Sequence, residues 1–145
     1  MKKVMVCPKN TGNTHKVCDY VSRKLGIELK VVDGTTGTNL EDCDVVILSS
    51  GVYGNHVHEN LQTWINSISD GDIKPNAKFY VFFTWFGRGK SDQAAFGELK
   101  DLLENKGLKL EDNYMKCFGK GMVFVRKSHP NEEDCENILS WVNGL

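Results

Sequence analysis

The 145 residues suffice for one domain that buries its own core, and we expect a single domain over residues 1–145. Lysine plus arginine total 18 and aspartate plus glutamate total 19, so the net charge of -1 supplies no basic field for nucleic acid. No apolar stretch is long enough to span a bilayer, and the apolar part of residues 1–10 is too short for a signal peptide. We therefore expect a protein that binds neither nucleic acid nor membrane.

The five cysteines are an odd number without a CxxC pair or metal-type spacing. This pattern indicates free thiols rather than a disulfide framework, and free thiols are typical of a reducing compartment. We expect a cytoplasmic protein.

Apolar runs and helical periodicity alternate along the chain. Four runs predict strands, at residues 2–7, 27–33, 43–50 and 77–85, and a fifth, less regular strand region contains residues 108–110, 114–118 and 122–125. Four helices are marked by Val17, Cys18, Val21 and Leu25, by Leu61, Trp64, Ile65 and Ile68, by Phe96, Leu99, Leu102 and Leu103, and by Cys135, Ile138, Leu139 and Val142. Gly26 and Gly107 are placed as stops. The alternation predicts an open α/β fold with a parallel sheet and helices on both faces.

Ligands of such sheets bind beyond the carboxyl ends of the strands, so the loops at 8–14, 49–59 and 84–91 are the candidate site. The first loop, CPKNTGNT, places backbone N–H groups of residues 10–14, the hydroxyls of Thr11 and Thr14 and the amide of Asn13 at a helix N-terminus, which suits a phosphate. It has neither GxxxxGK[ST] nor GxGxxG spacing. The alternative is that TGNT only caps the helix, and the loop alone does not decide between them.

The second loop, SSGVYGNH, and the third, TWFGRGKS, combine aromatic residues with glycines. Exposed rings beside open backbone suit a flat ligand whose edge meets backbone donors and acceptors. The alternative is that Trp85 and Phe86 end a core strand and that Tyr53 packs on the next helix.

Together these residues resemble the short-chain flavodoxins, and the resemblance runs through the whole chain. Its motifs are TGNT at 11–14, YGNH at 53–56, FGRG at 86–89, GKG at 119–121 and HPNEEDCENILSW at 129–141. The resemblance implies a three-layer flavodoxin-like sandwich with a five-stranded parallel sheet in the order 2-1-3-4-5, and FMN bound without a covalent link.

The resemblance also implies roles for individual residues. Residues 10–14 would hold the phosphate, Tyr53 and Phe86 would flank the flavin ring with Trp85 as a competitor, and the peptide after Gly54 would turn over when the flavin gains an electron. The residues expected to contact FMN are Lys9, Asn10, Thr11, Gly12, Asn13, Thr14, Ser50, Gly51, Val52, Tyr53, Gly54, Asn55, Thr84, Trp85, Phe86, Gly87, Arg88 and Gly89.

Three positions depart from the family pattern. Lys9 stands where the family usually has Ser or Thr, and Asn55 and Arg88 stand where members often carry Asp. Reduced FMN is anionic, so the loss of nearby acids is expected to raise the potential for the second electron.

The resemblance favours a monomeric electron carrier that works between a flavodoxin reductase and an acceptor, because no loop carries a catalytic acid or nucleophile. The alternative is an FMN-dependent NAD(P)H:quinone-type reductase, which would need a substrate pocket above the flavin. A phosphatase loop of the type C-x5-R that starts at Cys7 is excluded, because Asn13 stands where the arginine is required. A flavin-free binding module remains a further alternative, and the His56 and His58 pair is a weak metal motif without a third ligand.

Overall fold

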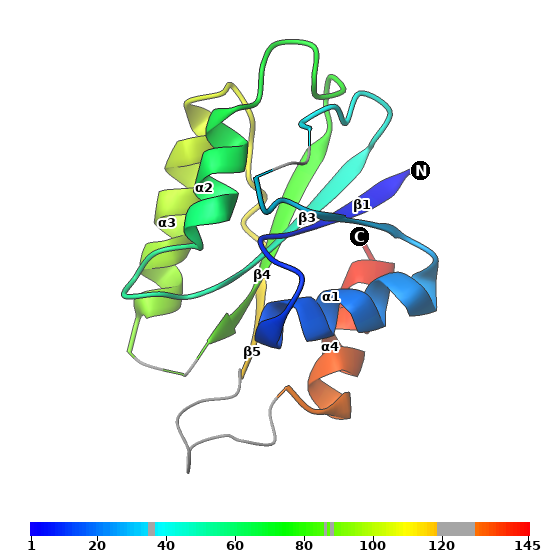
Figure 1. Ribbon diagram of the computed structural model, residues 1–145, viewed down its shortest axis with the longest axis vertical. Helices are drawn as coiled ribbons and strands as arrows, with labels where there is room; N and C mark the ends of the chain where they lie inside the picture. The colour runs from blue at the N-terminus through cyan, green and yellow to red at the C-terminus, as the bar shows by residue number, and fades with distance from the viewer. Residues whose placement is uncertain (35–36, 86, 88, 119–129) are drawn as a thin grey trace.

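A computed structural model describes residues 1–34, 37–85, 87, 89–118 and 130–145 (Figure 1). Five strands form one parallel sheet in the order β2-β1-β3-β4-β5, which confirms the predicted order. The strands are β1 (Lys3–Cys7), β2 (Glu28–Val31), β3 (Val45–Gly51), β4 (Lys78–Trp85) and β5 (Met115–Phe118).

The helices cover both faces of the sheet, so the predicted three-layer sandwich is confirmed (Figure 1). Helices α1 and α4 lie on one face, and α2 and α3 lie on the other. Their bounds are α1 (Gly12–Leu25), α2 (Glu59–Asn66), α3 (Ser91–Glu104) and α4 (Glu132–Asn143).

The central strands are buried on both faces because a helical layer covers each of them. All seven residues of β3 are buried, as the continuous apolar run at 43–50 predicted. Side chains alternate between the two layers, so Phe82 packs with α1 and α4 while Phe83 packs with α2 and α3. Each fully buried ring of this kind stabilises the fold by about 2 kcal/mol.

Two helix ends agree with the sequence. Gly26 follows α1 with φ 65°, a left-handed conformation that glycine adopts at little cost. Asn131 and Asp134 form a reciprocal capping box at the start of α4, whose first turn is acidic.

Other boundaries differ from the expected ones. Helix α2 ends before Ile68, because the Ser67 hydroxyl donates to the Trp64 carbonyl at the last turn; Ile68 is still buried in the core. In the fifth strand region only Leu110 joins the sheet ahead of β5, through an isolated bridge to Phe79. The expected strand piece at 122–125 lies outside the described residues.

The five cysteines are free and buried, as expected for structural thiols. Cys7 is fully buried at the end of β1, where its thiol donates to the Lys9 carbonyl. Of the helices in the described ranges, none has the length and apolar character needed to cross a membrane.

Candidate functional site

Three loops meet at the carboxyl edge of the sheet, because β1, β3 and β4 run parallel and end there. Side-chain bonds join them across long stretches of sequence. The hydroxyls of Thr14 and Thr84 are 2.8 Å apart, and the Asn60 amide donates to the Pro8 carbonyl at 2.9 Å. The sequence therefore predicted correctly that these loops are neighbours.

The first loop is open toward solvent. Thr11 is the N-cap of α1 and has extended backbone, but its side chain makes no capping hydrogen bond. Gly12 follows with φ 91°, and a Cβ built there would lie 3.3 Å from Cε of Lys9. The lysine side chain thus passes close to the one position of the loop that has no side chain, beside the first N–H groups of the helix.

Thr14 differs from Thr11 in its surroundings. Both Thr14 and Thr84 are 4 % exposed, and their hydroxyls bond to each other inside the protein. The Thr14 side chain therefore ties the first loop to the end of β4, whereas Thr11 is exposed. Asn10 is exposed and Asn13 is half-buried in the same loop.

The second loop is a tight turn. Tyr53 and His56 exchange two backbone hydrogen bonds of 2.8 and 2.9 Å, and the residues between them, Gly54 and Asn55, have φ of 53° and 72°. Positive φ at both central positions identifies a type I′ turn, for which glycine and asparagine are favoured. The predicted switch position is therefore the first central residue of a two-residue hairpin.

The Tyr53 ring lies against the backbone of Gly51. A Cβ at Gly51 would be 2.7 Å from the tyrosine hydroxyl oxygen, so the ring occupies space that any other residue type would fill. Tyr53 is 47 % exposed, and its ring meets the His58 ring edge-on at 5.4 Å. Ser50 and Val52 connect the second loop to the rest of the protein. The Ser50 hydroxyl accepts from the His58 N–H, and Val52 packs against the α2/α3 core.

Glu98 of α3 anchors the second loop, and sequence reasoning missed it. One carboxylate oxygen accepts from the Val57 N–H at 3.0 Å, and the other pairs with Nδ1 of His56. No local pattern marks Glu98, because its partners lie about 40 residues earlier in the chain. The side chain of His56 is thereby held by Glu98.

His58 has a different task. Its Nδ1 accepts from the Asn60 N–H and caps α2. Burial, followed by the nearby Lys9 ammonium, lowers the pKa of His58 below its usual 6.5. Within the described ranges, no group of three His, Cys, Asp or Glu side chains is placed to hold a metal ion.

The third loop begins at Trp85, the last residue of β4. Gly87 and Gly89 are exposed and have φ of 76° and 52°. Phe86 and Arg88 lie outside the described residues, as do the GKG segment at 119–121 and His129.

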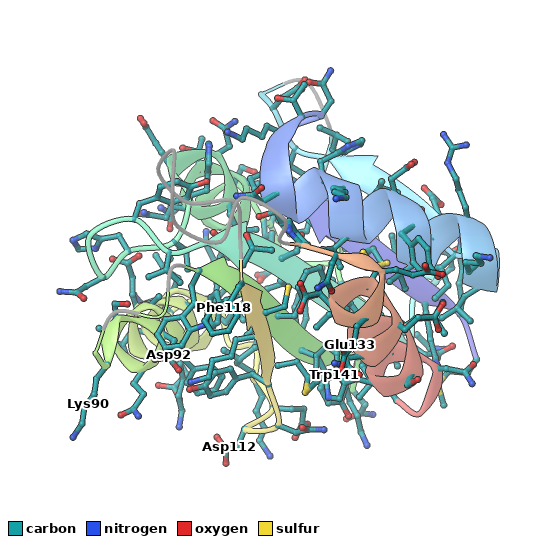
Figure 2. All side chains as sticks on the ribbon, turned by 90° about the horizontal axis from the view of Figure 1, so that it is seen from below. Lys90, Asp92, Asp112, Phe118, Glu133 and Trp141 are labelled. Carbon is teal, nitrogen blue, oxygen red and sulfur yellow. The ribbon has the colours of Figure 1, made fainter. Side chains whose placement is uncertain are left out.

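A buried carboxylate lies beside this loop, at the start of α3 (Figure 2). Asp92 is 1 % exposed and accepts hydrogen bonds at Oδ2 from Tyr114 (2.9 Å) and Lys116 (3.0 Å). The Lys116 ammonium also lies 4.3 Å from the centre of the Trp85 ring, a cation–π contact. Sequence reasoning missed this cluster, because an acid in the first turn of a helix is already explained by the helix dipole.

The charges of this cluster stabilise one another. Burial alone would raise the pKa of Asp92, but the hydrogen bonds from Lys116 and Tyr114 outweigh it and hold the pKa below 3.8. Burial and the neighbouring carboxylate raise the pKa of Tyr114 to about 12, so the phenol remains a donor. Asp92 is therefore an anion at neutral pH.

The carboxyl edge combines backbone donors at a helix N-terminus, an exposed hydroxyl, a lysine and two aromatic rings. Such a set binds an anionic group together with a flat ring. The residues expected at the site from the sequence lie at this edge wherever the structure describes them.

Comparison with known proteins gives a consistent assignment. The sequence matches the flavodoxin domain family over residues 9–128. An uncharacterized protein of Methanocaldococcus jannaschii is 26 % identical over 139 residues, which cover 92 % of this chain and 89 % of that protein.

Two solved structures share the fold over nearly their full lengths. Oxidised flavodoxin 1 of Bacillus cereus has a TM-score of 0.68 and 21 % identity, covering 100 % of this chain and 99 % of that one. Oxidised flavodoxin 2 of Bacillus cereus has a TM-score of 0.71 and 18 % identity, covering 99 % and 96 %. The family match includes most of the first loop and all of the second and third. Members of this family generally use a flavin cofactor. The match shows that this chain belongs to the flavodoxin domain family.

Proposed function

We propose that this protein binds FMN at the carboxyl edge of the sheet and transfers electrons between redox partner proteins. The observation that carries the proposal is the first loop, where the Thr11 side chain makes no capping hydrogen bond and Gly12, which has no side chain, lies beside that of Lys9. A loop that served only to cap α1 would use the threonine hydroxyl for the cap.

The first loop would hold the phosphate of FMN. Backbone N–H groups of residues 10–14 stand at the positive end of the α1 dipole, where an anion is stabilised. The Lys9 ammonium would add a full positive charge and the Thr11 hydroxyl a hydrogen bond. Thr14 and Thr84 would keep the loop in place through their buried bond.

The second and third loops would hold the flavin ring. Tyr53 offers a half-exposed ring at the same edge, and its position against Gly51 lets it lie flat beside a planar ligand. Phe86 is the proposed partner on the opposite face. The face of Trp85 that contacts Lys116 is already covered, which supports Phe86 over Trp85 for this role.

Bound FMN would supply electron-transfer chemistry in one-electron and two-electron steps. The chain's own residues bind and orient it, and the Gly54–Asn55 peptide is positioned to reorient. Glycine changes its backbone region at low cost, and the hydrogen bonds between Tyr53 and His56 fix the two ends of the turn while its centre moves.

The proposed partners are a reductase and an electron acceptor, and the protein is proposed to act as a monomer. The five buried free thiols support a reducing compartment such as the cytoplasm. Lys90 at the start of α3 points away from the protein beside the third loop (Figure 2), so it is a candidate contact for an acidic partner.

The decisive experiment compares FMN with riboflavin, which has the same ring but no phosphate. We expect apoprotein to quench the fluorescence of FMN at concentrations at which riboflavin stays free. The double variant Lys9→Met/Thr11→Val should weaken FMN binding about tenfold and leave the weak riboflavin affinity unchanged.

Two results would contradict the proposal. Equal affinities for FMN and riboflavin would mean that the phosphate contributes nothing to binding, and no binding of either would indicate a flavin-free module. Rapid bleaching of the bound flavin by NADPH without a separate reductase would replace the carrier by the NAD(P)H:quinone-type reductase.

A further inference from the structure

The buried carboxylate of Asp92 is not needed by the binding site described above. It lies at the first turn of α3, where an exposed acid would satisfy the helix dipole equally well. Instead it is 1 % exposed, and its Oδ1 atom has no hydrogen-bond partner in the described part of the chain. Burial of a charge with one oxygen unpaired is costly, so its counter-charge is essential.

That counter-charge is Lys116, which connects the carboxylate to the third loop. Its Nζ atom lies 3.0 Å from Oδ2 of Asp92 and 4.3 Å from the centre of the Trp85 ring. The lysine side chain is 43 % exposed, whereas Asp92 is enclosed by Tyr114 and the start of α3. The pair is thus oriented, with its negative end inside the protein and its positive end on the residue that begins the third loop.

The aromatic packing behind the pair keeps this orientation fixed. The ring of Tyr114 stacks on Phe96 at 4.6 Å and meets Phe83 edge-on at 5.8 Å, while its hydroxyl donates to Asp92. Both Phe96 and Phe83 belong to the α2/α3 core. Asp92 therefore cannot follow Lys116 outward without breaking this packing.

We propose that Asp92 and Lys116 act as an oriented ion pair that raises the reduction potential of FMN bound against the third loop. The inference rests on the proposed function. Reduction adds negative charge to the flavin, and a positive charge held closer to it than the matching negative charge favours the reduced form. Asp92 and Lys116 act here as positioning residues, through Trp85 and the loop, and need not touch the flavin.

The two single variants have opposite predicted signs. Lys116→Met removes the near positive charge and should lower the midpoint potential, and a tenfold change in the one-electron equilibrium corresponds to about 59 mV. Asp92→Asn removes the opposing negative charge and should raise the potential. The double variant Asp92→Asn/Lys116→Met loses the whole pair, so its potential should lie between those of the single variants and below the wild-type value by less than that of Lys116→Met.

A purely structural role would give another pattern. Loss of either partner would then loosen Trp85 in the same way, so both single variants would move the potential in one direction and the double variant would move it further. Tyr114→Phe removes a hydrogen bond to Asp92 without a change of charge and reports the structural contribution alone. Lys90→Met removes an equal charge from the exposed N-cap of α3 and should shift the potential less than Lys116→Met.

The experiment is a spectroelectrochemical titration of the FMN-loaded wild-type protein and these variants, with the tryptophan fluorescence of the apoproteins as a second readout. Opposite shifts for the single variants, with the double variant between them and below wild type, support the inference. Shifts of one sign, or a Lys116→Met shift no larger than that of Lys90→Met, overturn it even if Asp92→Asn fails to fold. If the wild-type protein binds no FMN, the proposed function fails and this inference with it, whereas FMN binding without these shifts overturns the inference alone.

Discussion

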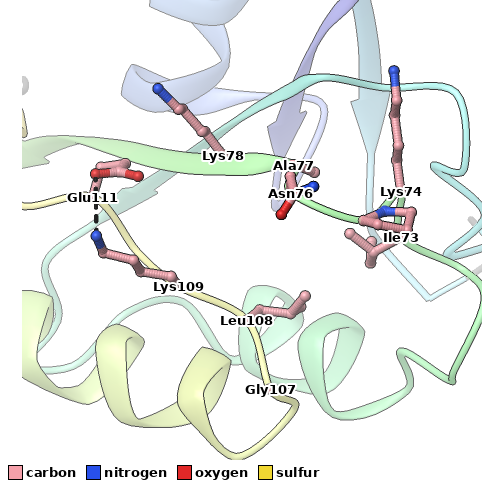
Figure 3. A pocket seen from close by; sticks show the side chains of 10 residues that line it. Ile73, Lys74, Asn76, Ala77, Lys78, Gly107, Leu108, Lys109 and Glu111 are labelled. Carbon is pink, nitrogen blue, oxygen red and sulfur yellow. Dashed lines mark ion pairs between the residues drawn. The ribbon is translucent and has the colours of Figure 1, made fainter.

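The amino and carboxyl edges of the sheet both contain lysines and glycines, but the residues around them differ. The amino edge has a cavity of about 470 Å³ lined by three lysines and by turn residues, with no aromatic side chain in its wall (Figure 3). Two of its lysines face carboxylates: Lys74 pairs with Asp44, and Lys109 lies 3.9 Å from Glu111. At the carboxyl edge, Lys9 has no ion-pair partner among the residues that the structure describes, and it lies over a glycine beside a half-exposed tyrosine.

Glycine turns and lysines occur at both edges, so they alone do not distinguish the proposed FMN site. Gly107 at the amino edge and Gly12 at the carboxyl edge both have positive φ. The first follows a helix end, where such a residue only redirects the chain. The second lies at the start of α1, where the same backbone freedom leaves room beside the first N–H groups, as the proposed phosphate site requires. The following predictions test this contrast.

The largest expected effect is on Gly12. Gly12→Ala would place a Cβ 3.3 Å from Lys9 at φ 91°, where L-residues are strained. We expect FMN affinity to fall more than tenfold in a fluorescence titration. The matched control is Gly107→Ala at φ 71°, where a Cβ meets nothing within 4 Å. It should cost about 1 kcal/mol in the free energy of unfolding and leave FMN affinity unchanged. Equal losses of affinity in both variants would contradict the contrast.

The second-largest effect on FMN affinity is expected for Tyr53, whose half-exposed ring lies at the carboxyl edge. Tyr53→Ala should weaken FMN binding about fivefold, as expected for a lost aromatic contact of about 1 kcal/mol. Tyr53→Phe keeps the ring and should bind FMN as the wild type does. Leu108→Ala, in the wall of the amino-edge cavity, should leave the affinity unchanged. A loss in Tyr53→Phe equal to that in Tyr53→Ala would assign the effect to the hydroxyl instead of the ring.

Much of the fold follows from local patterns. Gly26 marks a helix end in the sequence, and the structure has it there. The burial of β3 was also predictable, from its continuous apolar run. Ile68 shows where local patterns fail: it keeps the helical period but lies past the end of α2, because burial in a core does not require helical backbone.

The site was predictable only where its residues are contiguous. Its three loops carry glycines, aromatics and hydroxyls in short motifs, and these do meet at one edge. The residues that support the loops were missed, since Glu98 contacts His56 and Lys116 contacts Asp92 across many intervening residues. Pairwise contacts of this kind depend on the register of β5 with β4 and on the placement of α3, which no local pattern specifies.

A smaller effect is expected at the amino edge, on stability at low pH. The hydrogen bond from Lys74 lowers the pKa of Asp44. A carboxyl with a lowered folded-state pKa contributes stability above its unfolded pKa of about 3.8 and loses it as the pH falls through the folded value. Lys74→Gln should therefore lower stability near neutral pH, with a difference from wild type that vanishes in acid, as measured by urea unfolding across that range. FMN affinity should not change; if it did, the two edges would not be independent.

The smallest expected effect concerns His58 beside the first loop. Its pKa is lowered first by burial and then by Lys9, so the unfolded state binds its proton more readily. The free energy of unfolding should accordingly decline as the pH falls below about 6.5, the unfolded value. Lys9→Met should raise the pKa of His58 in an NMR titration, but only part of the way, because burial remains. An anion on the first loop would neutralise Lys9 and act in the same direction, so FMN should raise the His58 pKa in the wild-type protein and much less in Lys9→Met. An unchanged His58 pKa on FMN binding would place the phosphate away from Lys9.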